Sequence, residues 1–98
     1  MYRILVCDDN REVVSSIRIY LNAEGYQTVC AYGGQECLDL LREQEIHLVI
    51  LDVVMQGKDG ISTLSELREW SNVPVILLSR RRRIPTRSRG STSAQMTI

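Results

Sequence analysis

The spacing of hydrophobic residues changes several times along the chain, and each change marks a new predicted element. Residues 2–7, YRILVC, form a continuous apolar run that is typical of a strand buried on both faces. The next apolar residues recur at helical spacing, with Asn10 placed to cap a helix and Gly25 to end it. This helix is predicted over 10–24, and its apolar side carries Val13, Val14, Ile17, Tyr20 and Leu21.

The same alternation continues through the next fifty residues. Three more apolar runs have the length of strands, and two segments between them have helical spacing. The strands are predicted at 26–32, 46–54 and 73–79, and the helices at 33–45 and from residue 60, where Ile61, Leu64 and Leu67 share one side. The order β-α-β-α-β-α-β predicts an α/β fold, with a doubly wound parallel sheet as the middle of three αβα layers.

Composition adds a charge asymmetry to this pattern. The chain has 98 residues, enough for one domain, and its 12 acidic residues all precede residue 80, whereas 80–98 contains six arginines and no acid. No apolar run reaches the roughly 18 residues of a membrane span, and no secretory signal is recognisable. Cys7, Cys30 and Cys37 lack paired spacing and are predicted to be reduced core residues, which favours the cytoplasm.

Acidic residues end two of the predicted strands. Asp8 and Asp9 follow the first strand, Asp52 lies at the end of the third, and the hydroxyl of Ser79 ends the fourth. If the first and third strands are neighbours, the carboxylates converge at the edge where open α/β sheets bind ligands. Such an oxygen cluster suits Mg²⁺, and a carboxylate beside Mg²⁺ can attack phosphorus to form an aspartyl phosphate. Asp8 and Asp9 alone would equally well cap a helix, but the other two residues favour the ligand site.

The segments ILVCDDN, LVILDVVMQGKDG and VPVILLS together resemble the receiver domain of bacterial two-component response regulators. They occur in the family's order and at approximately its spacing, and the resemblance covers residues 1–79. It implies a flavodoxin-like fold and a role in a phosphorelay, in which a sensor histidine kinase phosphorylates the domain. Such a domain assists its own phosphorylation and dephosphorylation and is not an enzyme in the usual sense. The family usually has proline after the methionine of the second segment, whereas Gln56 follows Met55 here.

The resemblance also implies a role for each residue of the cluster. Asp52 would be the phosphoacceptor and a metal ligand, Asp9 a direct ligand of Mg²⁺, and Asp8 a ligand that acts largely through water. The main-chain carbonyl of Val54 would complete the protein ligands. Ser79 would be the switch hydroxyl, which binds the phosphoryl group and moves toward it on activation.

Several parts of the family's fold have no counterpart in this sequence. Receiver domains have five strands and five helices, but no strand-like run follows Ser79, so the fourth helix, fifth strand and fifth helix (α4-β5-α5) are lacking. The family's lysine at the end of the fifth strand and its switch aromatic are absent as well, because the only lysine is Lys58, in an earlier loop. We therefore expect a partial receiver domain over 1–79, with impaired switching and an uncovered sheet edge that favours aggregation or a homodimer.

The segment 80–98 is predicted to be a basic, non-native tail produced by out-of-frame translation. With one base restored after the codon for Ser79 and suitable wobble bases, its codons translate as AxxEDSDKIAGLNLGADDY. That string resembles the family's own continuation through a fourth helix toward a fifth strand, so a frameshift near codon 79 explains the abrupt change in composition. The hypothesis fails if the coding DNA, shifted by one base, does not encode such a continuation.

Two other functions remain open at this stage. The arginines after Ser79 would supply phosphate contacts in a nucleic-acid-binding protein, although no aromatic residues are interleaved with them. A small aspartyl-phosphate phosphohydrolase would need a second acid beside Asp52, and Val53 and Val54 offer none. On the leading interpretation the partners are a sensor histidine kinase and, only through an output domain missing from this chain, DNA; no membrane is expected.

Overall fold

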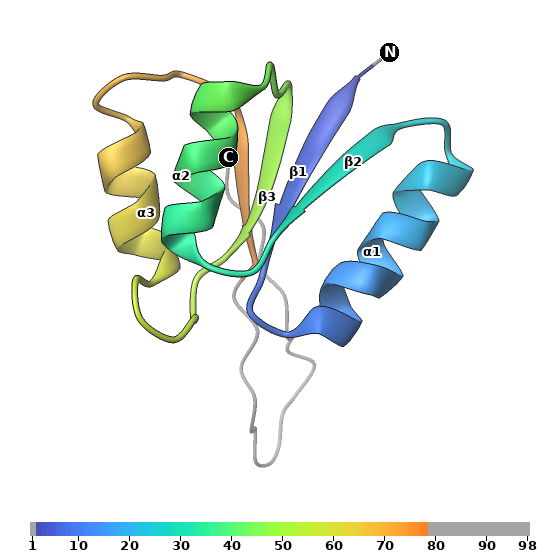
Figure 1. The fold of residues 1–98 in the computed structure, drawn as a ribbon, viewed down its shortest axis with the longest axis horizontal. Coiled ribbons are helices and arrows are strands. Elements are labelled where there is room, and N and C mark those ends of the chain that lie inside the picture. The colour runs from blue at the N-terminus through green and yellow to red at the C-terminus, as the bar shows by residue number, and fades with distance from the viewer. Residues whose placement is uncertain (1, 79–98) are drawn as a thin grey trace, which may run out of the picture.

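The computed structural model describes residues 2–78, which form one parallel sheet between two layers of helices (Figure 1). The elements are β1 (Arg3–Cys7), α1 (Arg11–Ala23), β2 (Gln27–Ala31), α2 (Gly34–Glu43), β3 (Leu48–Asp52), α3 (Gly60–Leu67) and β4 (Val75–Leu78). Each element lies within its predicted segment, so the alternation of strands and helices is confirmed. The predicted non-native tail, 80–98, lies outside the described residues.

The strands lie in the order β2-β1-β3-β4, and all neighbours are parallel. Helix α1 covers one face of the sheet, whereas α2 and α3 cover the other (Figure 1). This arrangement confirms the three-layer, doubly wound fold and places the first and third strands side by side. In the pairing of β1 with β3, Cys7 lies opposite Leu51.

Alternate residues of the strands pack into two separate cores. Strand β1 sends Leu5 and Cys7 toward α2 and α3, and Ile4 and Val6 toward α1. The core beneath α2 and α3 is much the larger of the two, and its buried members are Leu5, Cys7, Ala31, Cys37, Leu38, Ile46, Val49, Leu51, Met55, Leu67 and Val75. The predicted burial of Cys7 and Cys37 is confirmed, and all three cysteines are free thiols.

The face on the side of α1 is only partly covered within the described residues. Its fully buried cluster consists of Ile4, Val6 and Val14, and α1 contributes only the last of these. Beside this cluster is an apolar cavity of about 490 Å³, lined by Tyr2, Ile4, Leu21, Tyr26, His47, Leu48, Ile50 and Ile76. One face of the sheet is therefore well sealed, and the other has apolar side chains that residues 2–78 leave accessible.

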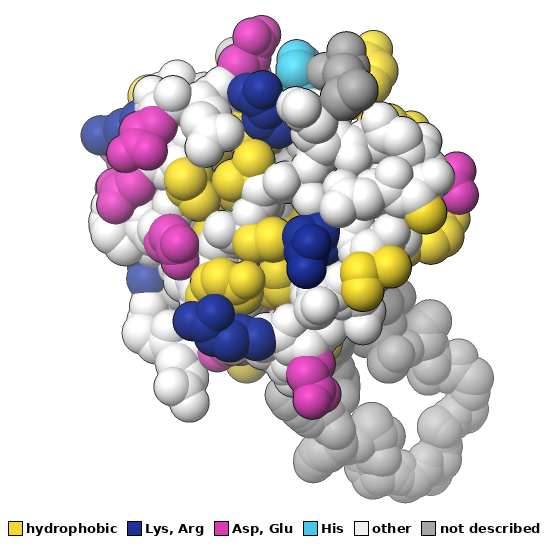
Figure 2. Space-filling model, turned by 45° about the vertical axis from the view of Figure 1, so that its right-hand side comes forward, with side chains coloured by type: hydrophobic (Ala, Val, Ile, Leu, Met, Phe, Trp, Pro, Cys, Tyr) yellow, Lys and Arg dark blue, Asp and Glu magenta, His cyan; other side chains and the backbone are white. Residues whose placement is uncertain are grey.

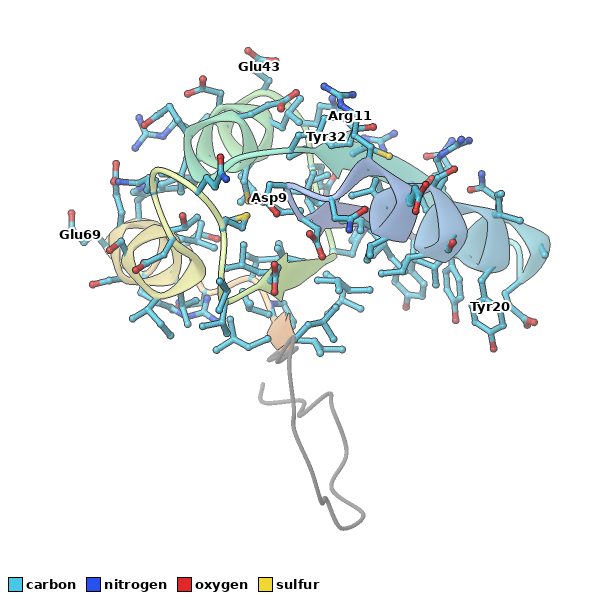
Figure 3. All side chains as sticks on the ribbon, turned by 90° about the horizontal axis from the view of Figure 1, so that it is seen from below. Asp9, Arg11, Tyr20, Tyr32, Glu43 and Glu69 are labelled. Carbon is cyan, nitrogen blue, oxygen red and sulfur yellow. The ribbon has the colours of Figure 1, made fainter. Side chains whose placement is uncertain are left out.

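Two residues assigned to apolar helix faces are exposed instead. In α3, Thr63 and Leu67 face the sheet, so Ile61, two residues before Thr63, lies on the opposite side and is 53% exposed. In α1 only Val14 is buried, and Tyr20, about a third of a turn around the helix from it, is 65% exposed and points away from the sheet (Figure 3). Each helix therefore buries a narrower stripe of residues than the apolar spacing of its sequence indicates.

The ends of α1 follow the predicted signals. The side-chain oxygen of Asn10 accepts hydrogen bonds from the amides of Glu12 (2.9 Å) and Val13 (3.3 Å), and Gly25 follows the helix with a φ of +96°. Among the helices within residues 2–78, none has the length and hydrophobicity that crossing a bilayer requires.

Candidate functional site

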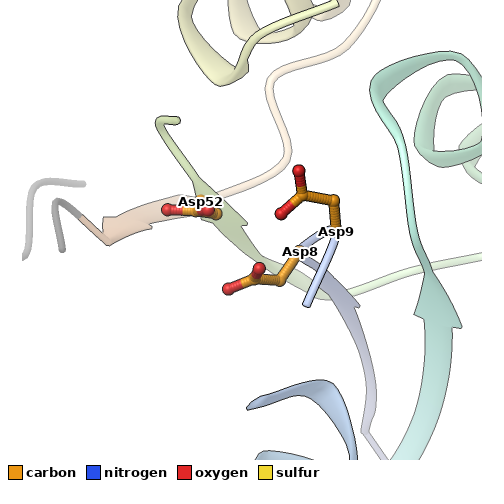
Figure 4. A group of neighbouring side chains, drawn as sticks. All are labelled: Asp8, Asp9 and Asp52. Carbon is orange, nitrogen blue, oxygen red and sulfur yellow. The ribbon is translucent and has the colours of Figure 1, made fainter. Parts of the chain in front are cut away.

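Three carboxylates meet at the carboxyl edge of the sheet. Because Cys7 pairs with Leu51, the next residues along the two strands, Asp8 and Asp52, lie level with each other. One oxygen from each of Asp8, Asp9 and Asp52 lies within 4.8 Å of the others (Figure 4). Asp8 and Asp52 are each only 1% exposed, whereas Asp9 is open to solvent. The predicted convergence of these residues is confirmed.

Backbone amides hold two of the carboxylates in place. The amide of Asn10 donates to Oδ1 of Asp8 at 2.9 Å, which turns the chain from β1 into α1. The amide of Gln56 donates to Oδ2 of Asp9, also at 2.9 Å, and this bond joins the β1–α1 loop to the β3–α3 loop. Figure 3 looks onto this edge of the sheet and shows Asp9 between the two helical layers. Asp9 and Gln56 are 47 positions apart in the sequence, and no sequence pattern predicts their hydrogen bond.

The loop after β3 is packed against the strand that carries Asp52. The amide of Gly60 donates to the carbonyl of Val53 at 2.9 Å, and Gly57 has a φ of +77°. A Cβ at position 60 would overlap the carbonyl oxygen of Asp52 and approach Cα of Val53 to 2.7 Å. Glycine is required at position 60 because the backbone of α3 begins against the end of β3.

The site consists of oxygen ligands only, and its charge is concentrated. Three carboxylates at this separation repel one another, and the burial of Asp8 and Asp52 reduces the screening by water. A small divalent cation would offset this repulsion, and carboxylates combined with water on the open side, at Asp9, are a ligand set that Mg²⁺ accepts. The residues therefore fit a magnesium site. Within residues 2–78 this is the one cluster of three or more acidic, histidine or cysteine side chains close enough to hold a metal ion.

A group of sulfur atoms lies directly beneath the acidic cluster. The thiol of Cys7 is 3.5 Å from the carbonyl of Gly33 and 3.7 Å from Sδ of Met55. Its hydrogen bond with Cys37, its burial and the nearby charge of Asp8 all raise the pKa of the Cys7 thiol. These effects favour the neutral form of the thiol, and the buried Cys7 side chain packs at the base of the site.

The remaining predicted site residues have a different status. The side chain of Val54 is exposed, and its carbonyl as a ligand stays a prediction. Ser79 lies outside the described residues, so its role as the switch hydroxyl also stays a prediction. Nζ of Lys58 forms an ion pair with Oε1 of Glu66 in α3, at 2.8 Å. This contact agrees with the expectation that Lys58 does not replace the family's lysine.

The sequence matches the response regulator receiver domain family over residues 4–96. The chain belongs to this family. The match extends into the segment 80–98, and the boundary that we place at Ser79 stays a prediction.

Individual relatives agree with this receiver assignment. The chain is 43% identical over 81 residues to the transcriptional regulatory protein CpxR of Escherichia coli K12, an alignment that covers 83% of this chain and 34% of CpxR. The chain thus spans about a third of the length of the curated relatives it matches.

Solved receiver structures share the fold. The N-terminal domain of a response regulator receiver protein from Methanoculleus marisnigri superposes with a TM-score of 0.80 at 33% identity, covering 87% of this chain and 72% of that one. The response regulator TrrA of Thermotoga maritima, solved in complex with Mg²⁺ and BeF, gives a TM-score of 0.71 at 32% identity, covering 79% of this chain and 66% of that one.

Proposed function

We propose that this receiver domain accepts a phosphoryl group on Asp52 from a phosphohistidine of a sensor histidine kinase, in the cytoplasm. The observation that carries the proposal is the position of Asp52, buried at the end of β3 with the carboxylates of Asp8 and Asp9 within 4.8 Å. In the transfer a carboxylate oxygen of Asp52 forms a bond to phosphorus, the bond between phosphorus and the histidine nitrogen breaks, and its electron pair returns to the imidazole.

The proposed metal ligands are the residues that surround Asp52. Asp9 and Asp52 would bind Mg²⁺ directly with the carbonyl of Val54, and Asp8 would act largely through water. The complex of the related TrrA with Mg²⁺ and BeF supports this choice of metal. Bound Mg²⁺ supplies positive charge that offsets the negative charge of the phosphoryl group.

The chain's own residues prepare Asp52 for this role. Burial removes water from the carboxylate, and the backbone of Gly60 fixes the end of β3 behind it. The exposed position of Asp9 leaves an approach from solvent for the phosphodonor. Ser79 is proposed to bind the phosphoryl group after transfer.

We further propose that switching is impaired in this chain and that 80–98 is out-of-frame sequence. The apolar cavity beside α1 supports the first idea, because residues 2–78 leave apolar side chains accessible on this face of the sheet. It also supports association into a homodimer or aggregate. The similarity to the transcriptional regulatory protein CpxR, over a third of its length, supports the proposal that any contact with DNA is made through an output domain.

A phosphohydrolase remains the weaker proposal, because the residues that follow Asp52 in the chain offer no second acid and the neighbouring Asp8 and Asp9 are proposed to bind Mg²⁺. Val53 and Val54 follow it directly, and the side chain of Val54 is exposed. Slow loss of phosphate by attack of water on the acyl phosphate is expected without such a base.

Phosphorylation is tested with labelled acetyl phosphate and Mg²⁺ on the full chain. Wild type and the matched control Asp39→Asn, an exposed carboxylate on α2, should incorporate label, whereas Asp52→Asn should not. Chelation of Mg²⁺ by EDTA should abolish labelling of the wild type. Equal labelling of Asp52→Asn and wild type would overturn the proposal.

A further inference from the structure

A groove follows the outer side of β2, at the opposite edge of the sheet from the acidic cluster. Its volume is about 680 Å³, and its polar lining comes from the starts of β1 and β2, from α1 and from the end of α2. These residues, which we call the β2 groove, are Arg3, Arg18, Asn22, Gln27, Thr28 and Gln44. Figure 2 looks onto this side of the molecule and shows hydrophobic side chains in a shallow hollow with dark-blue basic side chains beside it.

The two arginines of the β2 groove form no ion pair with a carboxylate of the described residues. Arg3 donates through Nε to Oε1 of Gln27 at 3.2 Å and through a terminal nitrogen to the carbonyl of Glu45 at 3.4 Å, and both acceptors are neutral. Arg18 forms no ion pair within residues 2–78. Glu45, whose main-chain carbonyl accepts from Arg3, has its carboxylate 3.8 Å from Nε2 of His47. The guanidinium of Arg3 is therefore bound by neutral acceptors only, and its charge is available to a ligand.

The amide side chains of the groove present mainly donors. Oδ1 of Asn22 accepts from the hydroxyl of Thr28 at 3.1 Å, and Oε1 of Gln27 accepts from Arg3. Each of these oxygens already accepts a hydrogen bond, whereas the NH₂ groups of Asn22 and Gln27 donate none within the described residues and are available to a ligand. Two guanidinium groups and several amide donors, without an acidic side chain in the lining, select for an anion.

The backbone of β2 has groups that can pair with an extended ligand. Strand β2 pairs with β1 alone among the described strands. The amide of Gln27 donates to Tyr2 at 3.0 Å, and the carbonyl of Ala31 accepts from Asp8 at 3.1 Å, so residues 27, 29 and 31 face β1. The backbone groups of Thr28 and Cys30 consequently point outward, where another extended chain can pair with them.

We propose that the β2 groove binds an extended acidic peptide segment of a partner protein. The segment adds to the sheet as a strand beside β2, and its carboxylates contact Arg3 and Arg18. The volume of the β2 groove, about 680 Å³, is sufficient for several residues of a peptide and is much larger than the volume that an inorganic anion needs. This inference is independent of phosphorylation, because the groove and the acidic cluster lie at opposite edges of the sheet.

The test uses a fluorescein-labelled hexapeptide of two glutamates, two valines and two glutamates in that order, which places glutamate on both faces of an extended strand. Binding to the full chain is measured by fluorescence anisotropy. The same peptide with glutamine in place of glutamate is the ligand control. Arg18→Gln removes a side chain with no ion pair in the described fold, and Arg42→Gln is the matched control, since Arg42 lies over the ring of Trp70 and does not line the groove. We expect Arg18→Gln to weaken binding of the acidic peptide about threefold to tenfold, and Arg42→Gln to leave it unchanged.

Hydrogen exchange then tests the pairing with β2. On binding, the amides of Thr28 and Cys30 should exchange more slowly, while those of residues 27, 29 and 31 change little. The proposal is overturned if the glutamine peptide binds equally well, or if both arginine variants weaken binding to the same extent. It is also overturned if citrate displaces the peptide at equal concentration and Thr28 and Cys30 gain no protection, which would indicate a site for small anions.

Discussion

At the scale of single residues, the acidic cluster combines two buried carboxylates with one exposed carboxylate. Asp8 and Asp52 are fixed at the ends of adjacent strands, whereas Asp9 is held by a single bond from the amide of Gln56. Like charges held close together destabilise the fold unless a cation is bound. The site is thus expected to oppose folding in the absence of a metal and to support it in the presence of one.

The variant Asp8→Asn tests this expectation. It keeps the oxygen that accepts from Asn10 but removes one charge, so without Mg²⁺ it should raise the free energy of unfolding by about 1–3 kcal/mol. Urea denaturation with and without Mg²⁺ measures the effect, and Mg²⁺ should stabilise the wild type more than the variant. Asp39→Asn serves as the control for removing a carboxylate elsewhere. A less stable Asp8→Asn protein without Mg²⁺ would contradict the repulsion argument.

At the scale of elements, α3 depends on a cap and on a close approach to the strand before it. Oδ1 of Asp59 accepts from the amide of Ser62 at 2.8 Å, and this hydrogen bond, with the charge of Lys58, lowers the pKa of Asp59. Gly60 then begins the helix against the carbonyl of Asp52. The start of α3 therefore determines how the proposed phosphorylation loop is held.

The cap predicts a pH dependence. The pKa of Asp59 is lower in the folded chain than in the unfolded chain, so the ionised carboxylate stabilises the fold. This contribution to the free energy of unfolding is fully present above the ordinary carboxyl pKa of about 4, and it is lost as the pH falls through the pKa of the folded state. Asp59→Ala should be less stable than wild type at pH 7, and the difference should shrink toward acid pH. Asp59→Asn retains an acceptor and should show a smaller loss with little pH dependence. Thermal unfolding across this pH range distinguishes the variants, and a constant difference for Asp59→Ala would refute the role of charge.

The close approach of Gly60 to the backbone of Asp52 predicts that adding a methyl group at position 60 destabilises the fold. Gly60→Ala should lower the free energy of unfolding by about 1–3 kcal/mol, because the new Cβ has no space beside Asp52. Gly33→Ala is the matched control, since a Cβ there meets nothing within 4 Å and its φ is an extended value. Similar stabilities of the two variants in urea would contradict the account of the loop.

Much of this arrangement could be predicted from the sequence because it depends on periodicity. The apolar run of β1 and the carboxylates directly after it fixed the strand, its end and the location of the cluster. The exposure of Ile61 could not be predicted, because the stripe that a short helix buries depends on its rotation against the sheet. The bond from Gln56 to Asp9 and the thiol contact of Cys7 with Cys37 also depend on tertiary packing, which has no local signal.

At the scale of the whole molecule, the two faces of the sheet are unequal. Within residues 2–78, the face beneath α2 and α3 is well covered, whereas the face beside α1 has a cavity lined by apolar residues that include Leu48, Ile50 and Ile76. Accessible apolar surface of this kind favours contact with another molecule.

We expect the chain to self-associate through this face as its concentration rises. Ile76→Ser should weaken the association, because Ile76 lines the cavity, whereas Ile61→Ser, at an exposed position on α3, should not. Sedimentation velocity over a concentration series measures both effects. A monomer at every concentration, or equal effects of the two variants, would argue against this face as the contact.

The slight anchoring of α1 has a consequence for motion. A helix that buries only Val14 can detach from the sheet at a lower free energy than elements packed in the larger core. Detachment that also broke the hydrogen bond from Gln56 would release Asp9 with the loop leading into α1, while Asp8 and Asp52 would stay at the ends of paired strands. A cation that needs all three carboxylates would have to hold α1 closed, and its affinity would therefore include the free energy of that local folding step.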